Sequence, residues 1–360
     1  MSGEALPIRS IRIAAADLRE LQQDAWSKQM KPVQLELEGS SYKAQFGYRG
    51  GHTRGYRKKS YEVRINGGRI LHWNAEYDDP SMMRNALSFY FFNKIGVLAP
   101  KTKHFWLIIN GEPQGVYLEI ESVDELFFRE RGRSWKSIIY AVNDSANFSL
   151  IDPITKSAKT DLFDGYEVVS GGAGTKTRLR TFLASIHKLP RQKLQPYLAR
   201  RLDIDQYLLW LAGAVLTGNY DGFDQNYALY EHGGTGKYRI LPWDYEGTWG
   251  RNCYGKPCGS NLVRLEGYNH LTQAVLSYSA YRQQYKKVMT SLLRDAFTTD
   301  ELVPVIQQMH SHIDSAIRHD HTRGSSYATF ASEPAFMRQY ISERRDILKT
   351  ALQEWKPNKG

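Results

Sequence analysis

Three polar side chains in the third quarter of the chain have the types and the spacing of a metal-dependent site. Asp221 and Asn226 lie five positions apart in the segment DGFDQN, and Asp244 follows in the segment WDYEG. Mg²⁺ prefers hard oxygen ligands and usually takes one or two carboxylates together with substrate phosphates and water. A carboxylate beside such a cation can also accept a proton. The residue types therefore predict a cation site that holds a phosphate-bearing ligand.

The elements around these residues are expected to bring them together. Residues 203–217 have an acidic first turn and an almost wholly apolar middle, which predicts a buried helix that ends just before the first aspartate. Two β-rich runs, 227–230 and 238–241, flank a Gly-Gly-Thr-Gly turn and predict a hairpin. Because a hairpin places its outer ends side by side, the three polar groups should converge at one edge of this ribbon.

The first third of the chain predicts strands with one helix. Period-2 alternation and β-rich composition indicate strands at 33–37, 42–48, 61–65, 104–109 and 116–120. The last two flank Asn110-Gly111, a hairpin signal, and residues 81–95 have the pattern of a helix that stops at Gly96. We therefore expect an α+β protein with a β-rich lobe at 1–121 and a larger, mainly helical lobe at 122–360.

Composition favours a globular protein made in the cytoplasm. Hydrophobic residues make up 41% and aromatic residues 12% of the 360 residues, without a long polar run. The start of the chain lacks the pattern of a secretory signal, and the longest apolar run, 207–216, is too short to cross a bilayer. The surplus of Lys and Arg over Asp and Glu is 48 − 38 = 10. It is spread along the chain, so nucleic acid is not the expected partner.

The order of these features is typical of protein kinases. Kinases place an Asp in the catalytic loop, an Asn five positions later, and a metal-binding Asp after the next pair of strands. Here the same order follows a buried helix and a β-rich lobe. The alternative interpretation is that these acidic residues only cap turns.

Six segments extend this pattern to a resemblance that covers nearly the whole chain. They are YRGGHTRGYRKKSYEV, LHWNAEYDDPSMMRNALS, INGEPQGVYLEIESVDE, IIYAVNDSANFSL, LAGAVLTGNYDGFDQNYALY and ILPWDYEGTWGR. In this order they resemble the conserved segments of the spore coat protein H kinase family. The resemblance implies an atypical, two-lobed protein-kinase-like fold with a nucleotide between the lobes. It also implies the use of ATP and Mg²⁺ or Mn²⁺ to phosphorylate serines of spore coat proteins, in the mother-cell cytoplasm and then in the coat.

The resemblance also implies roles for single residues of the larger lobe. Asp221 would be the catalytic aspartate that orients or deprotonates the substrate hydroxyl, and Asn226 and Asp244 would hold the metal. Tyr140 and Trp243 would enclose the adenine between their rings, since aromatic faces stack well on purines. The alternative for both rings is an ordinary place in the core.

In the smaller lobe the expected contacts are with the phosphates. Lys58 or Lys59, expected in the strand after the glycine-containing turn, would offset the triphosphate charge. A strand points neighbouring side chains to opposite faces, so only one of them should reach, and Lys59 is favoured. Arg49 or Arg54 would assist, or would simply be solvated.

Several features differ from ordinary kinases and leave alternatives open. The helix after Ser81 has no glutamate to pair with the lysine, so that Glu76, Glu119 or Glu121 would take this part. Transfer of AMP in place of phosphate is one alternative activity. A structural coat organiser without catalysis is another.

Three further patterns are set aside as sites. The glycine-rich segment 171–177 lacks the spacing of a phosphate-binding loop and the strand that should precede it, so we expect a flexible surface loop. Four histidines between 310 and 321 are not spaced as ligands on one helix face. Cys253 and Cys258 are too few for a disulfide framework or a zinc site and are expected in an ordinary loop.

Overall fold

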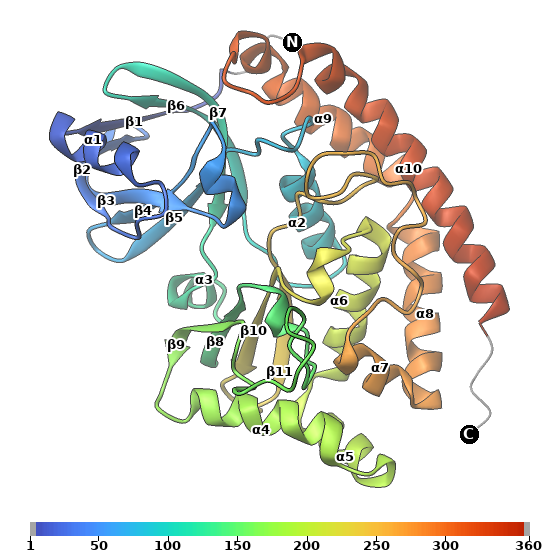
Figure 1. Cartoon of the computed structure of the whole chain (residues 1–360). Coiled ribbons are helices and arrows are strands. Elements are labelled where there is room, and N and C mark those ends of the chain that lie inside the picture. The colour runs from blue at the N-terminus through green and yellow to red at the C-terminus, as the bar shows by residue number, and fades with distance from the viewer. Residues whose placement is uncertain (1–4, 356–360) are drawn as a thin grey trace. The chain divides into compact units, whose positions relative to one another are not determined.

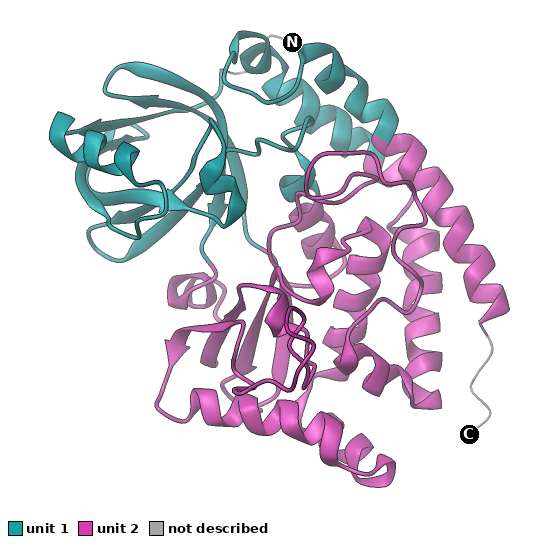
Figure 2. Ribbon diagram, in the orientation of Figure 1, with its two compact units in different colours: residues 1–87, 100–122, 303–336 teal, residues 88–99, 123–302, 337–360 magenta. Residues whose placement is uncertain are grey.

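The computed structural model describes residues 5–355 and contains both sheets and helices, so the α+β class is confirmed (Figure 1). The chain divides into two compact units, each built from several segments (Figure 2). Unit 1 contains the residues up to Leu87, Pro100–Ser122 and Val303–Phe336; unit 2 contains Ser88–Ala99, Val123–Leu302 and the residues from Met337. The sequence suggested lobes at 1–121 and 122–360, whereas here residues 88–99 belong to unit 2 and residues 303–336 belong to unit 1.

Unit 1 contains a closed seven-stranded barrel. Its strands follow the order β1-β2-β3-β4-β5-β7-β6, and β1 pairs with β6 in parallel to close it. Their bounds are β1 Ile8–Ile13, β2 Lys31–Leu37, β3 Ser40–Arg49, β4 Ser60–Ile65, β5 Arg69–Asn74, β6 Thr102–Ile109 and β7 Glu112–Glu121. Five of these strands match the sequence prediction, whereas β1 and β5 were not predicted. Helix α1 (Ala15–Gln23) follows β1, and the short helix η1 (His52–Gly55) precedes β4.

A charged residue lies on the inward face of β1. For this reason the sequence of β1 lacks the alternation of apolar and polar residues that predicts a strand. Arg9 faces inward with Ile11 and Ile13 and is 1% exposed, while Ile8 faces outward. The Arg9 guanidinium lies 3.5 Å from the Glu119 carboxylate. A buried cation that is paired in this way breaks the apolar alternation on which strand prediction depends.

The β6–β7 hairpin was predicted from Asn110-Gly111 and is confirmed. Both residues have positive φ, 50° and 86°, as the two central positions of a type I′ turn require. Inside the barrel, Phe46, Val63 and Trp73 are fully buried and form part of its apolar core.

Unit 2 contains a four-stranded sheet of order β11-β10-β8-β9, which is more strand than the mainly helical lobe expected from the sequence. The predicted hairpin is confirmed as β10 (Tyr227–His232) and β11 (Tyr238–Pro242). Strands β8 (Trp135–Ala141) and β9 (Tyr166–Gly171) were missed. β9 is an edge strand, and along it only Tyr166 is buried, so it lacks a clear apolar face. It leads directly toward helix α4 (Thr175–Lys188), which corrects the expectation that no strand precedes the glycine-rich segment.

The predicted central helix of unit 2 is α6 (Ile204–Thr217). The Asp203 side chain accepts a hydrogen bond from Gln206 N at 3.3 Å and caps its start, and Gly218 ends it with φ 73°. The other helices of this unit are α3 (Glu125–Glu130), α5 (Arg191–Arg201), α7 (His270–Leu276) and α8 (Ser279–Asp295). Helices α2 (Arg84–Lys94), α9 (Thr299–His319) and α10 (Tyr327–Glu354) have residues in both units. Between residues 5 and 355, no helix is both long and apolar enough to cross a membrane.

Candidate functional site

Asp221 lies in the loop after α6, and the backbone of this loop packs closely against neighbouring side chains. Asp221 opens the short helix η3 (Asp221–Phe223), and the buried Asn219 side chain accepts a hydrogen bond from Gly222 N at 2.9 Å. A Cβ at Gly222 would lie 2.8 Å from Asn219 Nδ2, so this position requires glycine. On the other side, Asn269 Nδ2 donates to Phe223 O at 2.8 Å. The backbone that carries Asp221 is therefore fixed from two sides.

Backbone hydrogen bonds bring the three predicted residues to one end of the β10–β11 ribbon. Gln225 N donates to Asp221 O at 3.1 Å, and Trp243 N donates to Asn226 O at 3.1 Å. Asn226 and Asp244 thus flank the last cross-strand pair of the ribbon. Both have positive φ, 59° and 57°. Residues other than glycine rarely adopt a backbone conformation with positive φ. Backbone strain of this kind concentrates at functional sites.

The loop that carries Asp244 is anchored in the interior of unit 2. Trp249 is fully buried, donates its indole N–H to Ser88 Oγ at 2.9 Å, and donates its backbone N–H to Thr217 O at 2.8 Å. Thr248 donates its hydroxyl to Tyr245 O at 2.6 Å. Because Thr217 is the last residue of α6, this contact ties the Asp244 loop to the helix that positions Asp221.

The site contains more negative charge than the sequence pattern indicated. Burial, followed by the charges of Asp144 and Asp221, raises the pKa of Asp224 to about 6, while Lys159 opposes this shift. Lys159 is half-buried and donates to Asn147 Oδ1 at 3.0 Å. The carboxylate of Asp244, the amide of Asn226 and this acidic surrounding fit a hard divalent cation in their chemistry. Across residues 5–355, no group of three or more His, Cys, Asp and Glu residues forms a metal site.

Cys253 lies against Asp221, a proximity that the sequence did not indicate. Burial, the Asp221 carboxylate and Glu246 together raise the pKa of its thiol to about 12. The thiol therefore stays protonated at neutral pH and is a poor nucleophile or metal ligand. Cys253 is therefore a neutral neighbour of the Asp221 carboxylate.

The two aromatic residues expected at the adenine are in contact with each other. The ring centroids of Tyr140 and Trp243 are 5.2 Å apart at an interplanar angle of 30°, and both rings are partly buried against the same apolar cluster. The Tyr140 hydroxyl accepts a hydrogen bond from Val123 N at 2.9 Å. A purine between the rings needs about 7 Å, twice the rise of about 3.4 Å between stacked bases. The rings would therefore have to separate to enclose a base.

Lys58 is a buried structural cation of unit 1. Its ammonium is 3.0 Å from Asp320 Oδ2, donates to Val116 O at 2.7 Å, and lies 4.7 Å from the centre of the Tyr117 ring. Burial lowers the pKa of Lys58 to about 8, although Asp320 favours the charged form. Asp320 Oδ2 also accepts from Val116 N at 2.8 Å. Lys58 is therefore fully engaged in holding α9 to the barrel strand β7.

Lys59 and the arginines lie around the loop that precedes β4. Both lysines were expected in a strand, but β4 begins only at Ser60, so they lie in the loop before it. Lys59 is half-buried and donates to Arg54 O, and the Arg54 guanidinium donates to Tyr48 O at 2.7 Å and to Ser27 O at 2.9 Å. Arg49 donates to Asn74 Oδ1. Arg54 thus serves to fix the loop, and the Lys59 ammonium lies at its edge.

The partner of the buried lysine was not among the glutamates considered from the sequence. Glu76 accepts two hydrogen bonds from Asn85, Glu119 accepts from the Trp73 indole, and Glu121 accepts from Lys101 N. Glu76 raises the pKa of Lys58 only as a more distant charge. The direct partner, Asp320, lies 262 residues along the chain from Lys58. No local sequence signal could have identified it.

Comparison with known proteins gives a consistent assignment. The family model described as CotH kinase protein matches residues 46–348. The inner spore coat protein H of Bacillus subtilis (strain 168) is 38% identical over 353 residues, which covers 96% of this chain and 98% of that protein. The inner spore coat protein H-like protein of the same strain is 28% identical and covers 81% of this chain and 84% of that protein.

Two solved structures share a weaker likeness. The proinflammatory kinase CtkA of Helicobacter pylori is 13% identical, with a TM-score of 0.35, over 86% of this chain and 95% of that chain. HipA in its complex with HipB and operator DNA from Shewanella oneidensis MR-1 is 12% identical, with a TM-score of 0.40, over 98% of this chain and 75% of that chain. The assignment rests on the family model and the sequence relatives: the chain belongs to the CotH kinase protein family.

Proposed function

We propose that this protein is an ATP- and divalent-metal-dependent protein kinase that phosphorylates serines of spore coat proteins. Its place would be the mother-cell cytoplasm and then the spore coat. The observation that carries the proposal is that the backbone hydrogen bonds of Gln225 and Trp243 hold the segments of Asp221, Asn226 and Asp244 at one end of the β10–β11 ribbon. Membership of the CotH kinase protein family and similarity to the inner spore coat protein H of Bacillus subtilis support the choice of substrate.

Asp221 is the proposed catalytic residue. A serine hydroxyl attacks the γ-phosphorus of ATP, its proton passes to the Asp221 carboxylate, the bond from that phosphorus to the bridging oxygen breaks, and ADP leaves. The role of the protein in such a reaction is mostly positioning, which agrees with a backbone fixed through Gly222 and Phe223. The protonated Cys253 thiol adds no competing charge beside Asp221.

Asn226 and Asp244 are the proposed holders of Mg²⁺ or Mn²⁺. Both residues have positive φ, a sparsely populated backbone conformation. This conformation restricts the directions in which their side chains can extend from the end of the ribbon. When bound, the cation would supply positive charge to the phosphates. The Asp224 carboxyl, whose pKa burial raises to about 6, would add to the attraction of a cation above that pH.

The remaining contacts concern the nucleotide. We propose Lys59 as the phosphate-binding lysine in preference to Lys58, because Lys58 is buried in an ion pair while Lys59 is only half-buried. Arg49 is a further proposed phosphate contact. Tyr140 and Trp243 would bind the adenine after their rings separate from the present 5.2 Å.

The test uses ATP labelled in two positions. Purified protein is incubated with a spore coat protein, Mg²⁺ or Mn²⁺, and either γ-labelled or α-labelled ATP. The proposal predicts transfer of the γ-label alone, and its loss in Asp221→Asn with an unchanged melting temperature. Transfer of the α-label would assign AMP transfer, and no transfer of either label would favour a coat organiser without catalysis.

A further inference from the structure

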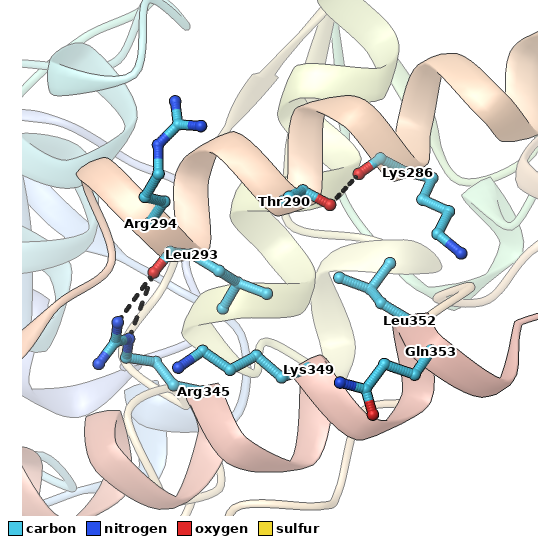
Figure 3. A pocket seen from close by; sticks show the side chains of 8 residues that line it. All are labelled: Lys286, Thr290, Leu293, Arg294, Arg345, Lys349, Leu352 and Gln353. Carbon is cyan, nitrogen blue, oxygen red and sulfur yellow. Dashed lines mark hydrogen bonds between the residues drawn. The ribbon is translucent and has the colours of Figure 1, made fainter.

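A groove lies between helices α8 and α10 in unit 2, apart from the residues discussed above. Its volume is about 440 Å³. Basic and apolar side chains from the two helices line it: Lys286, Leu293 and Arg294 from α8, and Arg345, Lys349 and Leu352 from α10. No acidic side chain lines it. In Figure 3 Arg345 and the Lys349 ammonium lie toward one end of the groove and Lys286 toward the other, while the Arg294 side chain points away from α10.

The two helices present the same spacing to the groove. On α8 the lining positions include 286, 293 and 294, and on α10 they include 345, 352 and 353, in each case i, i+7 and i+8. These positions lie on one face of a helix, so each helix offers a cation and a buried leucine on the same stripe. From residue 286 to 294 the stripe extends about 12 Å at a rise of about 1.5 Å per residue. The groove therefore matches about two turns of a bound helix or a short extended segment.

The charge of the groove is not neutralised by the chain itself. Lys286 and Lys349 are exposed, and neither ammonium forms an ion pair with another residue of the part of the chain that the structure describes. The Arg345 guanidinium donates to the carbonyl oxygen of Leu293 at 3.1 Å, which is a neutral acceptor. Among the cations of the groove, Arg294 has a carboxylate partner within residues 5–355, Asp295 at 2.6 Å. A ligand with negative charge would thus complete pairs that this chain leaves open.

Charge and shape together select the kind of ligand. A second copy of this chain carries a basic surplus of 48 − 38 = 10, so its net charge is not complementary to the groove. Single-stranded nucleic acid is usually held by aromatic rings on which bases stack, and no aromatic side chain lines this groove. A groove between two helices whose cations have long aliphatic stems offers both apolar and charged contacts, as an amphipathic peptide requires.

We propose that the α8–α10 groove is a docking site for an acidic, amphipathic segment of a partner protein. Carboxylates of that segment pair with Lys286 and Lys349, and its apolar side chains lie along the aliphatic stems of the lining lysines and arginines, above the buried Leu293 and Leu352. This surface is distinct from the proposed catalytic group, and binding at it requires neither ATP nor metal.

The test measures the binding of a labelled acidic helical peptide, with glutamates and leucines in a helical repeat, to the full chain by fluorescence anisotropy. Lys286→Glu/Lys349→Glu should weaken binding by at least about tenfold, since two attractive pairs become repulsive. The control Lys287→Glu/Lys193→Glu makes the same change in net charge at exposed positions outside the groove. It should bind within about twofold of the unmodified protein.

Two further probes make the outcome decisive. A peptide with lysines in place of the glutamates should bind the groove variant better than the unmodified protein. An oligothymidylate should bind both proteins equally weakly. The proposal is overturned if the groove variant keeps its affinity for the acidic peptide, if the control variant loses as much, or if the oligothymidylate is the probe that depends on Lys286 and Lys349.

Discussion

Asp320 offers the sharpest test of the packing in unit 1. Its carboxylate accepts hydrogen bonds from Lys58 Nζ at 3.0 Å, from Val116 N at 2.8 Å, and from the Thr322 backbone N at 2.9 Å. The side chains of Asp320 and Lys58 are 0% and 2% exposed. Gly115 leaves room for this arrangement, because a Cβ there would lie 2.2 Å from Asp320 Oδ1. Asp320→Ala would leave a buried ammonium and two backbone donors without their acceptor.

The expected loss of stability is large. Removing one partner of a buried ion pair costs about 3–5 kcal/mol. The loss has a ceiling, because Lys58 already has a pKa of about 8 and can give up its proton. Without Asp320 this pKa falls further, and a lysine whose pKa is lower in the folded state binds fewer protons there than when unfolded. Raising the pH therefore stabilises the folded variant, and it should regain part of the stability lost relative to the unmodified protein as the pH rises toward about 8, the pKa of Lys58 in that protein.

The assay is urea denaturation of the unmodified protein, Asp320→Ala and a surface control at two pH values. Glu36→Ala removes the partner of Arg12 at 2.8 Å, an exposed pair, and should cost less than about 1 kcal/mol. The double variant Lys58→Met/Asp320→Leu should recover stability relative to Asp320→Ala, because no charge is then left buried. The reasoning is refuted if Asp320→Ala costs no more than Glu36→Ala, or if its cost does not change with pH.

Three other predictions concern the proposed site. Lys59→Met should raise the KM for ATP about tenfold or more in steady-state kinetics. Calorimetry should show a nearly unchanged melting temperature. An unchanged KM would exclude Lys59 from the phosphate site. Gly222→Ala should lower kcat and the melting temperature together, because its Cβ would lie 2.8 Å from Asn219 Nδ2, and normal kinetics would contradict this close packing. The pKa of Asp224 is raised by burial from 3.8 to about 6, so its contribution to stability is full below about pH 4 and is lost as the pH rises through 6. Asp224→Asn should abolish this part of the pH dependence of thermal unfolding, and an unaltered profile would argue against the shift.

The elements next to the proposed site could be predicted because their signals are local. The apolar middle and the Asp203 cap of α6, the turn between β10 and β11, and the spacing from Asp221 to Asn226 all lie within short stretches of sequence. Each corresponds to a physical requirement of one element, such as a helix cap or a hairpin turn. The sequence therefore indicated which side chains to examine.

The missing parts depend on contacts between distant segments. β1 carries an inward Arg9 whose partners are Glu38 in the β2–β3 turn and Glu119 in β7, so the sequence around Arg9 alone suggests an exposed charge. Asp320 meets Lys58 across 262 residues, and Cys253 meets Asp221 through the packing of two loops. Such pairs have no periodicity or local motif, because they form only when the tertiary structure is complete.

The central claim is that Asn226 and Asp244 share one cation beside Asp221. Anomalous diffraction from crystals of this protein soaked with Mn²⁺ and a non-hydrolysable ATP analogue tests it most directly. The account predicts a Mn²⁺ peak at about 2.0–2.2 Å from the side-chain oxygens of Asn226 and Asp244, with the Asp221 carboxylate facing the γ-phosphate. A nucleotide-bound Mn²⁺ that contacts neither residue, or an Asp221 turned away from the phosphate, would contradict it.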